Sequence, residues 1–125
     1  MEHVKNCISQ DNKMDIEKAL HFLRTNAQAY AEAKANRIYL SEFRKSKKAL
    51  LMISAEQQGK RTSQERESYA YGHQEYVQLL EGLKVAIEVE EKLSLDIERA
   101  KLMVEVWRTN ESTKRAEMAG YGNRS

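Results

Sequence analysis

Apolar residues recur in alternating steps of four and three along the second half of the chain. The row runs from Leu79 to Trp107, and only Glu90 interrupts it. This spacing places side chains on one face of an α-helix and is typical of a coiled-coil seam. It predicts a helix of about forty residues from Gln74 to Glu117, roughly 60 Å long. The row consists of Leu79, Leu83, Ala86, Leu93, Ile97, Ala100, Val104 and Trp107.

A helical period also occupies the first half of the chain. Residues 16–23 form an amphipathic segment, and a longer helical region follows at 27–58. Thr25 and Asn26 are both good N-caps, which leaves two alternatives open, a break between the segments or one continuous helix. In the longer region, the face predicted to meet a neighbouring helix consists of Ala31, Ala35, Ile38, Tyr39, Phe43, Ser46, Leu50 and Ile53.

Turn signals separate the two long helices. Gly59 is a good C′ residue, and the stretch from Thr62 to Glu65 matches a capping box that starts a new helix. This helix is short, because Tyr71-Gly72-His73 indicates its end. Tyrosines cluster around that end, either to close the hairpin core or to offer an exposed aromatic patch to a partner. They are Tyr69, Tyr71 and Tyr76.

Charge predicts how the two long helices pair. Between Lys34 and Lys48 there are six bases and one acid, whereas between Glu75 and Glu98 there are seven acids and two bases. Two long helices joined by a short one fold back antiparallel, which sets the basic segment beside the acidic one. The seam residue Glu90 is expected to pair across the hairpin with Arg44 or Lys34.

Composition agrees with an all-α, coiled-coil-like hairpin of one domain. The 125 residues contain no proline and are 41% hydrophobic and 32% charged, as is typical of long helices. We place the helical domain at 14–118, with a loosely ordered N-terminal extension at 1–13 and a flexible tail at 119–125. A single cysteine, Cys7, cannot form an internal disulfide and fits a reducing cytosol.

The sequence contains few motifs that indicate a membrane span, a metal site or a catalytic site. No apolar run reaches the roughly 20 residues of a membrane span, so a soluble, cytoplasmic protein is expected. His3 and Cys7 are four residues apart, but a metal site needs more ligands than two. No nucleophile, phosphate-binding loop or cofactor motif is recognisable, and we predict neither enzymatic activity nor a cofactor.

Two kinds of partner remain. A basic stripe on the first long helix, extended by the loop, is a candidate for binding nucleic-acid phosphates, and it consists of Lys34, Arg37, Arg44, Lys45, Lys48, Lys60 and Arg61. The C-terminal half of the second long helix instead carries more apolar surface than a hairpin covers. The segment 16–23 is expected to cover part of it near Val104 and Trp107. The remainder predicts a homodimer or other protein contact at Leu95, Leu102 and Val106, with Trp107 nearby.

Several segments together resemble small helical proteins encoded by tailed bacteriophages and prophages. They are Met14 to Ala19, Glu42 to Met52, Glu75 to Leu83 and Glu105 to Arg108. The resemblance covers most of residues 14–115 and implies an accessory role in the cytoplasm of a bacterial host. That role is either adaptor or inhibitor of a phage or bacterial protein, or a nucleic-acid-binding factor in recombination or replication.

Overall fold

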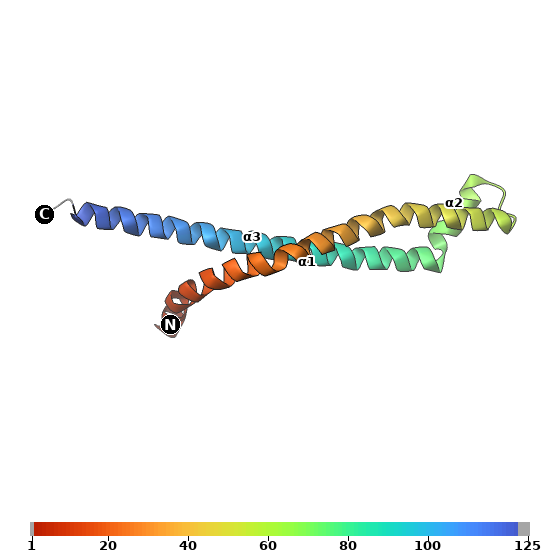
Figure 1. The fold of residues 1–125 in the computed structure, drawn as a ribbon. Helices are drawn as coiled ribbons and strands as arrows, with labels where there is room; N and C mark the ends of the chain where they lie inside the picture. Colours follow the sequence, from red (N-terminus) through yellow and green to blue (C-terminus); the bar gives the residue numbers. More distant parts are fainter. Residues whose placement is uncertain (1, 123–125) are drawn as a thin grey trace. The chain divides into compact units, whose positions relative to one another are not determined.

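Three α-helices make up the described part of the chain. The computed structural model describes the backbone of residues 2–122 and the side chains of residues 16–120. The helices are α1 (Glu2–Gln57), α2 (Ser63–Gly72) and α3 (Gln74–Gly122), and no strand occurs within residues 2–122 (Figure 1). The predicted all-α order of a long, a short and a long helix is confirmed.

Helix α1 runs without a break through Thr25 and Asn26. Thr25 Oγ1 donates a hydrogen bond of 2.9 Å to the carbonyl of His21, and Asn26 Nδ2 donates one of 3.1 Å to the carbonyl of Phe22. Both side chains therefore bond back along the helix rather than cap a new one. The alternative of a continuous helix is correct, and the segment 16–23 belongs to α1.

The two helix ends extend beyond the predicted domain boundaries. The backbone of residues 2–13 is helical and continuous with α1, and α3 continues to Gly122. Neither observation measures mobility, so the loose order expected for 1–13 stays a prediction. The expected flexible tail falls partly on residues 123–125, which lie outside the described residues.

Gly59 ends α1 as predicted. Its φ of 93° is in the left-handed region, which favours glycine. The amide of Lys60 donates to the carbonyl of Ala55 at 3.0 Å, and the amide of Gly59 donates to the carbonyl of Glu56 at 3.1 Å. These two bonds form a Schellman motif, which satisfies carbonyls that the helix end would leave unpaired.

Side chains cap the start of α2 and the start of α3. The Glu65 amide donates to Thr62 Oγ1 at 3.1 Å, and the Glu65 carboxylate in turn accepts from the Arg61 amide at 3.1 Å. At the other end, the extended residue His73 separates α2 from α3, and its Nδ1 accepts from the Glu75 amide at 3.1 Å. The predicted start and end of the short helix are confirmed.

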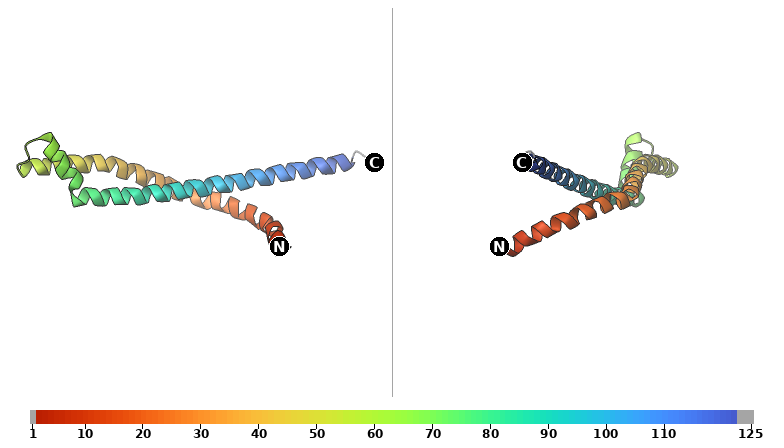
Figure 2. Two further views of the ribbon diagram at one scale, coloured as in Figure 1. Left: turned by 180° about the vertical axis from the view of Figure 1, so that it is seen from behind. Right: turned by 60° about the vertical axis from the view of Figure 1, so that its left-hand side comes forward.

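The chain divides into two compact units. Residues Ala29–Lys92 form one of them, called here the hairpin unit. In it, α1 and α3 run side by side in opposite directions, and α2 lies at the closed end (Figures 1 and 2). The terminal unit comprises Met1–Gln28 and Leu93–Ser125.

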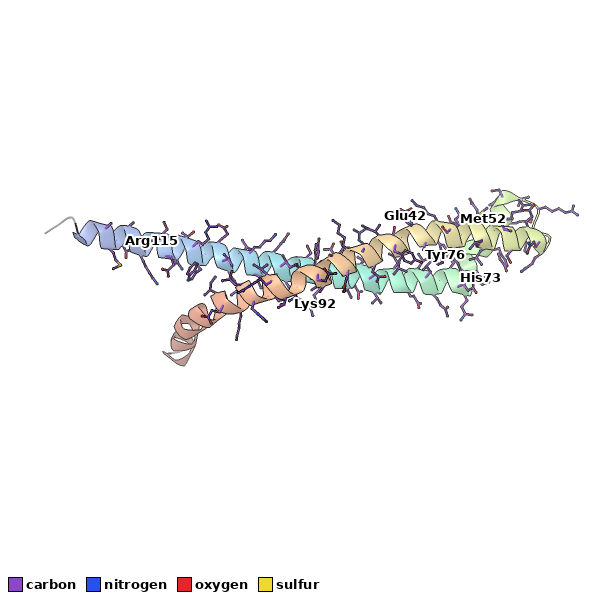
Figure 3. The ribbon with its side chains drawn as sticks, viewed as in Figure 1. Glu42, Met52, His73, Tyr76, Lys92 and Arg115 are labelled. Atoms are coloured by element: carbon purple, nitrogen blue, oxygen red, sulfur yellow. The ribbon has the colours of Figure 1, made fainter. Side chains whose placement is uncertain are left out.

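A small core closes the hairpin unit beside α2. Leu51, Ala70 and Tyr76 are 6%, 0% and 6% exposed and form one cluster, against which Met52 packs. Met52 and Tyr76 lie close together there in Figure 3. The Tyr71 ring meets the Tyr76 ring edge-on at a centroid distance of 5.4 Å. Tyr76 therefore closes the core, as predicted for the tyrosine cluster, whereas Tyr71 remains about half exposed.

The predicted seam of α3 is largely confirmed. Leu83, Ala86 and Ala100 are buried, and so is Glu90. Residues at the intervening seam positions are half-buried, namely Leu79, Leu93, Ile97 and Val104. Trp107 departs from the prediction, because it is 43% exposed.

The predicted inner face of α1 is wrong. Tyr39, Leu50 and Ile53, which were expected to face α3, are all more than half exposed. The less exposed residues belong to a row that is shifted by one position from the predicted face. We call this row the inner row. It consists of Ala33, Arg37, Leu40, Arg44, Lys47 and Leu51. A shift of one residue turns a helix by about 100°, so a different face of α1 meets α3.

Among the described side chains of the terminal unit, three apolar ones are buried. Ile16 and Ala19 belong to α1, and Ala100 belongs to α3. Both segments lie in this unit, as expected for residues 16–23 and the C-terminal half of α3. Cover of Val104 and Trp107 by residues 16–23 stays a prediction.

Candidate functional site

Arg37 and Glu90 form the central ion pair of the hairpin unit. The Arg37 guanidinium donates two hydrogen bonds to the Glu90 carboxylate, from Nε to Oε2 and from Nη2 to Oε1, the second at 3.3 Å. This fork geometry matches both carboxylate oxygens and fixes orientation. The hydrogen bond with Glu90 raises the pKa of Arg37. The partner predicted for Glu90, Arg44 or Lys34, is therefore corrected to Arg37.

Two further ion pairs lie nearer the closed end. Lys47 Nζ is 2.6 Å from Glu75 Oε2, and Lys48 Nζ is 3.6 Å from Glu67 Oε1. The Lys48 ammonium also lies 4.8 Å from the centroid of the Tyr71 ring, within cation–π range. Its hydrogen bond with Tyr71 raises the pKa of Lys48. The Arg37–Glu90 and Lys47–Glu75 pairs join the predicted basic and acidic segments, whereas Glu67 lies on α2, outside the predicted acidic segment.

The Lys47–Glu75 pair predicts a pH dependence of stability. The hydrogen bond from Lys47 lowers the pKa of Glu75. A carboxyl whose pKa is lower in the folded state stabilises that state above the unfolded pKa, about 4.3 for glutamate, and this contribution is lost as the pH falls through the folded pKa. Lys47→Met should therefore lower the melting temperature at pH 7 and have a much smaller effect at pH 3.

Lys45→Met is the matched control for that measurement. Lys45 lies 3.4 Å from Glu42 within the same helix, and both side chains are about two-thirds exposed. An exposed pair of this kind contributes little, so its removal should change the melting temperature only slightly at either pH. An equal effect of Lys47→Met at pH 7 and pH 3 would contradict the assigned role of Glu75.

The hairpin divides the predicted basic stripe. Arg37 pairs with Glu90 and Lys48 pairs with Glu67, and Arg44 is half-buried in the inner row. The other members are exposed, and Lys45 among them pairs with Glu42. The exposed members are Lys34, Lys45, Lys60 and Arg61. The structure therefore does not present the seven predicted cations as one continuous exposed row.

An exposed apolar row replaces the stripe as the main surface feature of α1. We call it the outer row, and it consists of Tyr39, Phe43, Ser46, Leu50 and Ile53. The exposed fractions of its large side chains, in chain order, are 64%, 37%, 59% and 52%. Tyr39 and Phe43 stack with ring centroids 5.9 Å apart. Each outer-row residue follows the previous one by four or three positions, so the row has the period of a second helical seam.

Helix α3 adds two valines to the same face of the hairpin unit. Each outer-row residue from Tyr39 to Leu50 precedes an inner-row residue of α1 by one, and Val85 and Val89 likewise precede the seam residues Ala86 and Glu90 of α3. When two helices pack antiparallel, residues that stand in the same position relative to the seam residues of their own helix lie on the same side of the helix pair. Val85 and Val89 are 57% and 47% exposed, so the apolar surface extends across both helices.

A separate exposed group lies on α3 in the terminal unit. Leu95, Leu102 and Val106 are 59%, 65% and 60% exposed. With Trp107 they form the surface predicted for oligomer or partner contact, called here the α3 patch. Seven- and four-residue spacings keep Leu95, Leu102 and Val106 on one side of the helix. Beside them, α3 residues from Glu105 to Arg115, Trp107 included, line a shallow hollow.

The described side chains contain no group of three His, Cys, Asp or Glu residues that could hold a metal ion. His3 and Cys7 lie outside the residues whose side chains are described. No helix in the described part of the chain is sufficiently long and apolar to cross a membrane.

Sequence reasoning recognised the residues of the outer row but assigned them to the wrong contact. The spacing of Arg37, Arg44 and Lys47 is the signal that indicates which row of α1 faces α3. It places these three charged residues in one row, next to the apolar outer row. The chain matches no protein-family model, and comparisons with curated proteins and with solved structures find no match.

Proposed function

We propose that this protein is a non-enzymatic helical adaptor or inhibitor that acts through protein contacts and self-associates. The observation that carries the proposal is the number of large apolar side chains left exposed on both long helices, in the outer row and the α3 patch. Contiguous apolar surface of this kind marks interaction sites in soluble proteins. The resemblance to small phage-encoded proteins adds an accessory role in a bacterial host.

Nucleic-acid binding is the competing function. It relies on cations, and two of those in the predicted stripe, Arg37 and Lys48, pair with Glu90 and Glu67. Each paired cation is less able to replace the counterions of a phosphate backbone. The exposed cations that remain are Lys34 on α1 and Lys60 and Arg61 in the loop, with Lys45 beside Glu42.

A pull-down from bacterial lysate, with and without nuclease, tests the proposal. We expect a specific protein to be captured equally in both conditions, because the contact is apolar. Substitution of Leu102 and Val106 by glutamate should abolish capture. The matched control is Lys101→Gln, an exposed neighbour on another side of α3, which should retain it.

A gel-shift at low salt tests the competing function directly. Under the proposal, the wild-type protein does not shift a DNA or RNA probe. A shift that disappears in both Lys34→Glu and Arg44→Glu, together with protein capture that depends on intact nucleic acid, would instead identify a nucleic-acid-binding factor. The substitutions are in α1, so they leave the α3 patch unchanged.

A further inference from the structure

We infer that His73 is a proton-sensitive cap between α2 and α3. Its neutral imidazole holds the first turn of α3, and its protonation in mild acid releases that turn and loosens α2 from the rest of the hairpin unit. His73 is the one residue between these helices, which end at Gly72 and begin at Gln74. This property is separate from the proposed function, because it involves neither the outer row nor the α3 patch.

The backbone and the side chain of His73 both take part in the start of α3. The residue is extended, with φ of −72° and ψ of 138°, and so interrupts the helical path between α2 and α3. Its carbonyl accepts from the Val77 amide at 3.1 Å, and its Nδ1 accepts from the Glu75 amide at 3.1 Å. This is N-cap geometry, in which a side-chain acceptor satisfies an amide that has no partner within the helix.

Only the neutral imidazole can accept the bond from the Glu75 amide. That bond uses the lone pair of Nδ1, so the proton of the neutral ring is on Nε2. In the imidazolium both nitrogens are donors, and a proton on Nδ1 would face the N–H of Glu75. Histidine is the side chain that ordinarily changes its charge between pH 5 and 8. Mild acid therefore removes the side-chain part of this cap.

The ionisable groups beside His73 come from all three helices. The Tyr69 ring of α2 lies 5.5 Å from the imidazole, and Glu75 of α3 binds Lys47 of α1 at 2.6 Å. The pKa of Glu75 is lowered first by Lys47 and to a smaller extent by the charge of His73. Tyrosine, glutamate and lysine ordinarily titrate outside pH 5–8. Histidine protonation is therefore the charge change expected at this junction in mild acid.

Two electrostatic effects on the imidazolium are weak in comparison with the lost hydrogen bond. The dipole ends of α2 and α3 act on a charge at His73 in opposite directions. The Glu75 carboxylate attracts the imidazolium, but its side chain is 56% exposed and already bound to Lys47. Solvent and salt screen an attraction of this kind. The loss of the acceptor at Nδ1 therefore decides the outcome.

Tyr76 connects the cap to α2. It lies in the first turn of α3, is 6% exposed, and belongs to the core cluster with Ala70 of α2 and Leu51 of α1. Its ring also meets the Tyr71 ring of α2 edge-on at 5.4 Å. In Figure 3, Tyr76 lies between α1 and α3, a short way along α3 from His73. When the first turn of α3 frays, Tyr76 is withdrawn from the contact that holds α2.

Other contacts of α2 do not involve His73. Lys48 Nζ of α1 lies 3.6 Å from Glu67 Oε1, and Gln58 Nε2 donates to the Tyr69 hydroxyl at 2.9 Å. These contacts remain in mild acid, so α2 should loosen without detaching. The long helices should also stay paired through Arg37 and Glu90. The expected change is therefore local to the closed end of the hairpin unit.

Amide hydrogen exchange of the full chain at pH 7.5 and pH 5.0 tests the inference, with His73→Asn as the reference at each pH. Asparagine is a good N-cap and does not titrate, and comparison at one pH cancels the intrinsic pH dependence of exchange. At pH 7.5, the amides of residues 65–72 and of Val77 should exchange equally in both proteins. At pH 5.0 they should exchange about five-fold faster in the wild type, as expected for the loss of one N-cap.

Two further variants serve as controls. His73→Ala lacks the cap at any pH, so its exchange in α2 should be fast at pH 7.5 as well as at pH 5.0. His21→Asn replaces an exposed histidine within α1, and it should exchange like the wild type at both pH values. Equal exchange of the wild type and His73→Asn at pH 5.0 would overturn the inference. So would a His21→Asn protein in which the acid effect on α2 is lost.

A pH titration followed by NMR identifies the group responsible. The amide resonance of residue 75 should shift with the same midpoint as the ring protons of His73. In Glu75→Gln, which keeps this amide but removes the carboxylate, the shift should persist, because the imidazole still binds the amide. A shift that disappears in Glu75→Gln would assign the pH effect to the carboxylate and overturn the role of His73.

Discussion

Replacing Leu51 with alanine is expected to lower the free energy of unfolding by about 2–4 kcal/mol. Leu51 is 6% exposed and belongs to the core cluster with Ala70 and Tyr76. Truncation removes apolar surface from that cluster and leaves a cavity that the surrounding helices fill only partly. Urea denaturation followed by circular dichroism, at one fixed protein concentration, measures the difference.

The control for Leu51→Ala is Leu102→Ala. Leu102 is 65% exposed, so its truncation removes few contacts and should change the free energy of unfolding by less than about 1 kcal/mol. It also lies outside both the hairpin core and the outer row. Equal effects of the two substitutions would show that Leu51 does not pack as the structure describes.

Replacing Ala70 with leucine should destabilise the hairpin unit by about 1–3 kcal/mol, because the larger side chain does not fit a filled core. Ala70 is 0% exposed, and it lies on α2 against Leu51 and Tyr76. The added atoms should push α2 away from the two long helices. Hydrogen exchange should therefore quicken first at the amides of residues 63–72.

Ala116→Leu provides the comparison for that substitution. Ala116 is an exposed residue of α3, so the same chemical change there leaves packing unaltered, and both residue types favour helix. Its unfolding free energy and amide exchange should match the wild type. If exchange in α2 stayed slow in Ala70→Leu, the close packing of α2 on the hairpin would be refuted.

Local sequence signals predicted the helix ends and the seam of α3 well. Gly59 and the capping box at Thr62 act through neighbours within six residues, so their geometry depends little on the rest of the chain. The α3 seam was recognisable because one apolar row dominates that helix from Leu79 to Val104. Trp107, at the end of this row, is more exposed than its position suggested.

The inner face of α1 was mispredicted because that helix carries two rows with the same period. One is apolar and contains Phe43 and Leu50, and the other contains the charged residues Arg37, Arg44 and Lys47. Burial of apolar surface favours the first row when the helix is considered alone. Only the presence of Glu90 and Glu75 on α3, at the right levels, makes the charged row the better partner.

The exposure of the outer row follows from the fact that the charged row of α1, and not the apolar one, faces α3. The sequence by itself determined that the protein is all-α, where its helices begin and end near the turns, and that basic and acidic helices pair antiparallel. These properties depend on spacing and on charges close in the chain. The tertiary structure decided that ion pairs occupy part of the hairpin interior and that the apolar outer row stays exposed. Such a choice depends on contacts between residues more than fifty positions apart, such as Arg37 and Glu90, which the period of one helix cannot reveal.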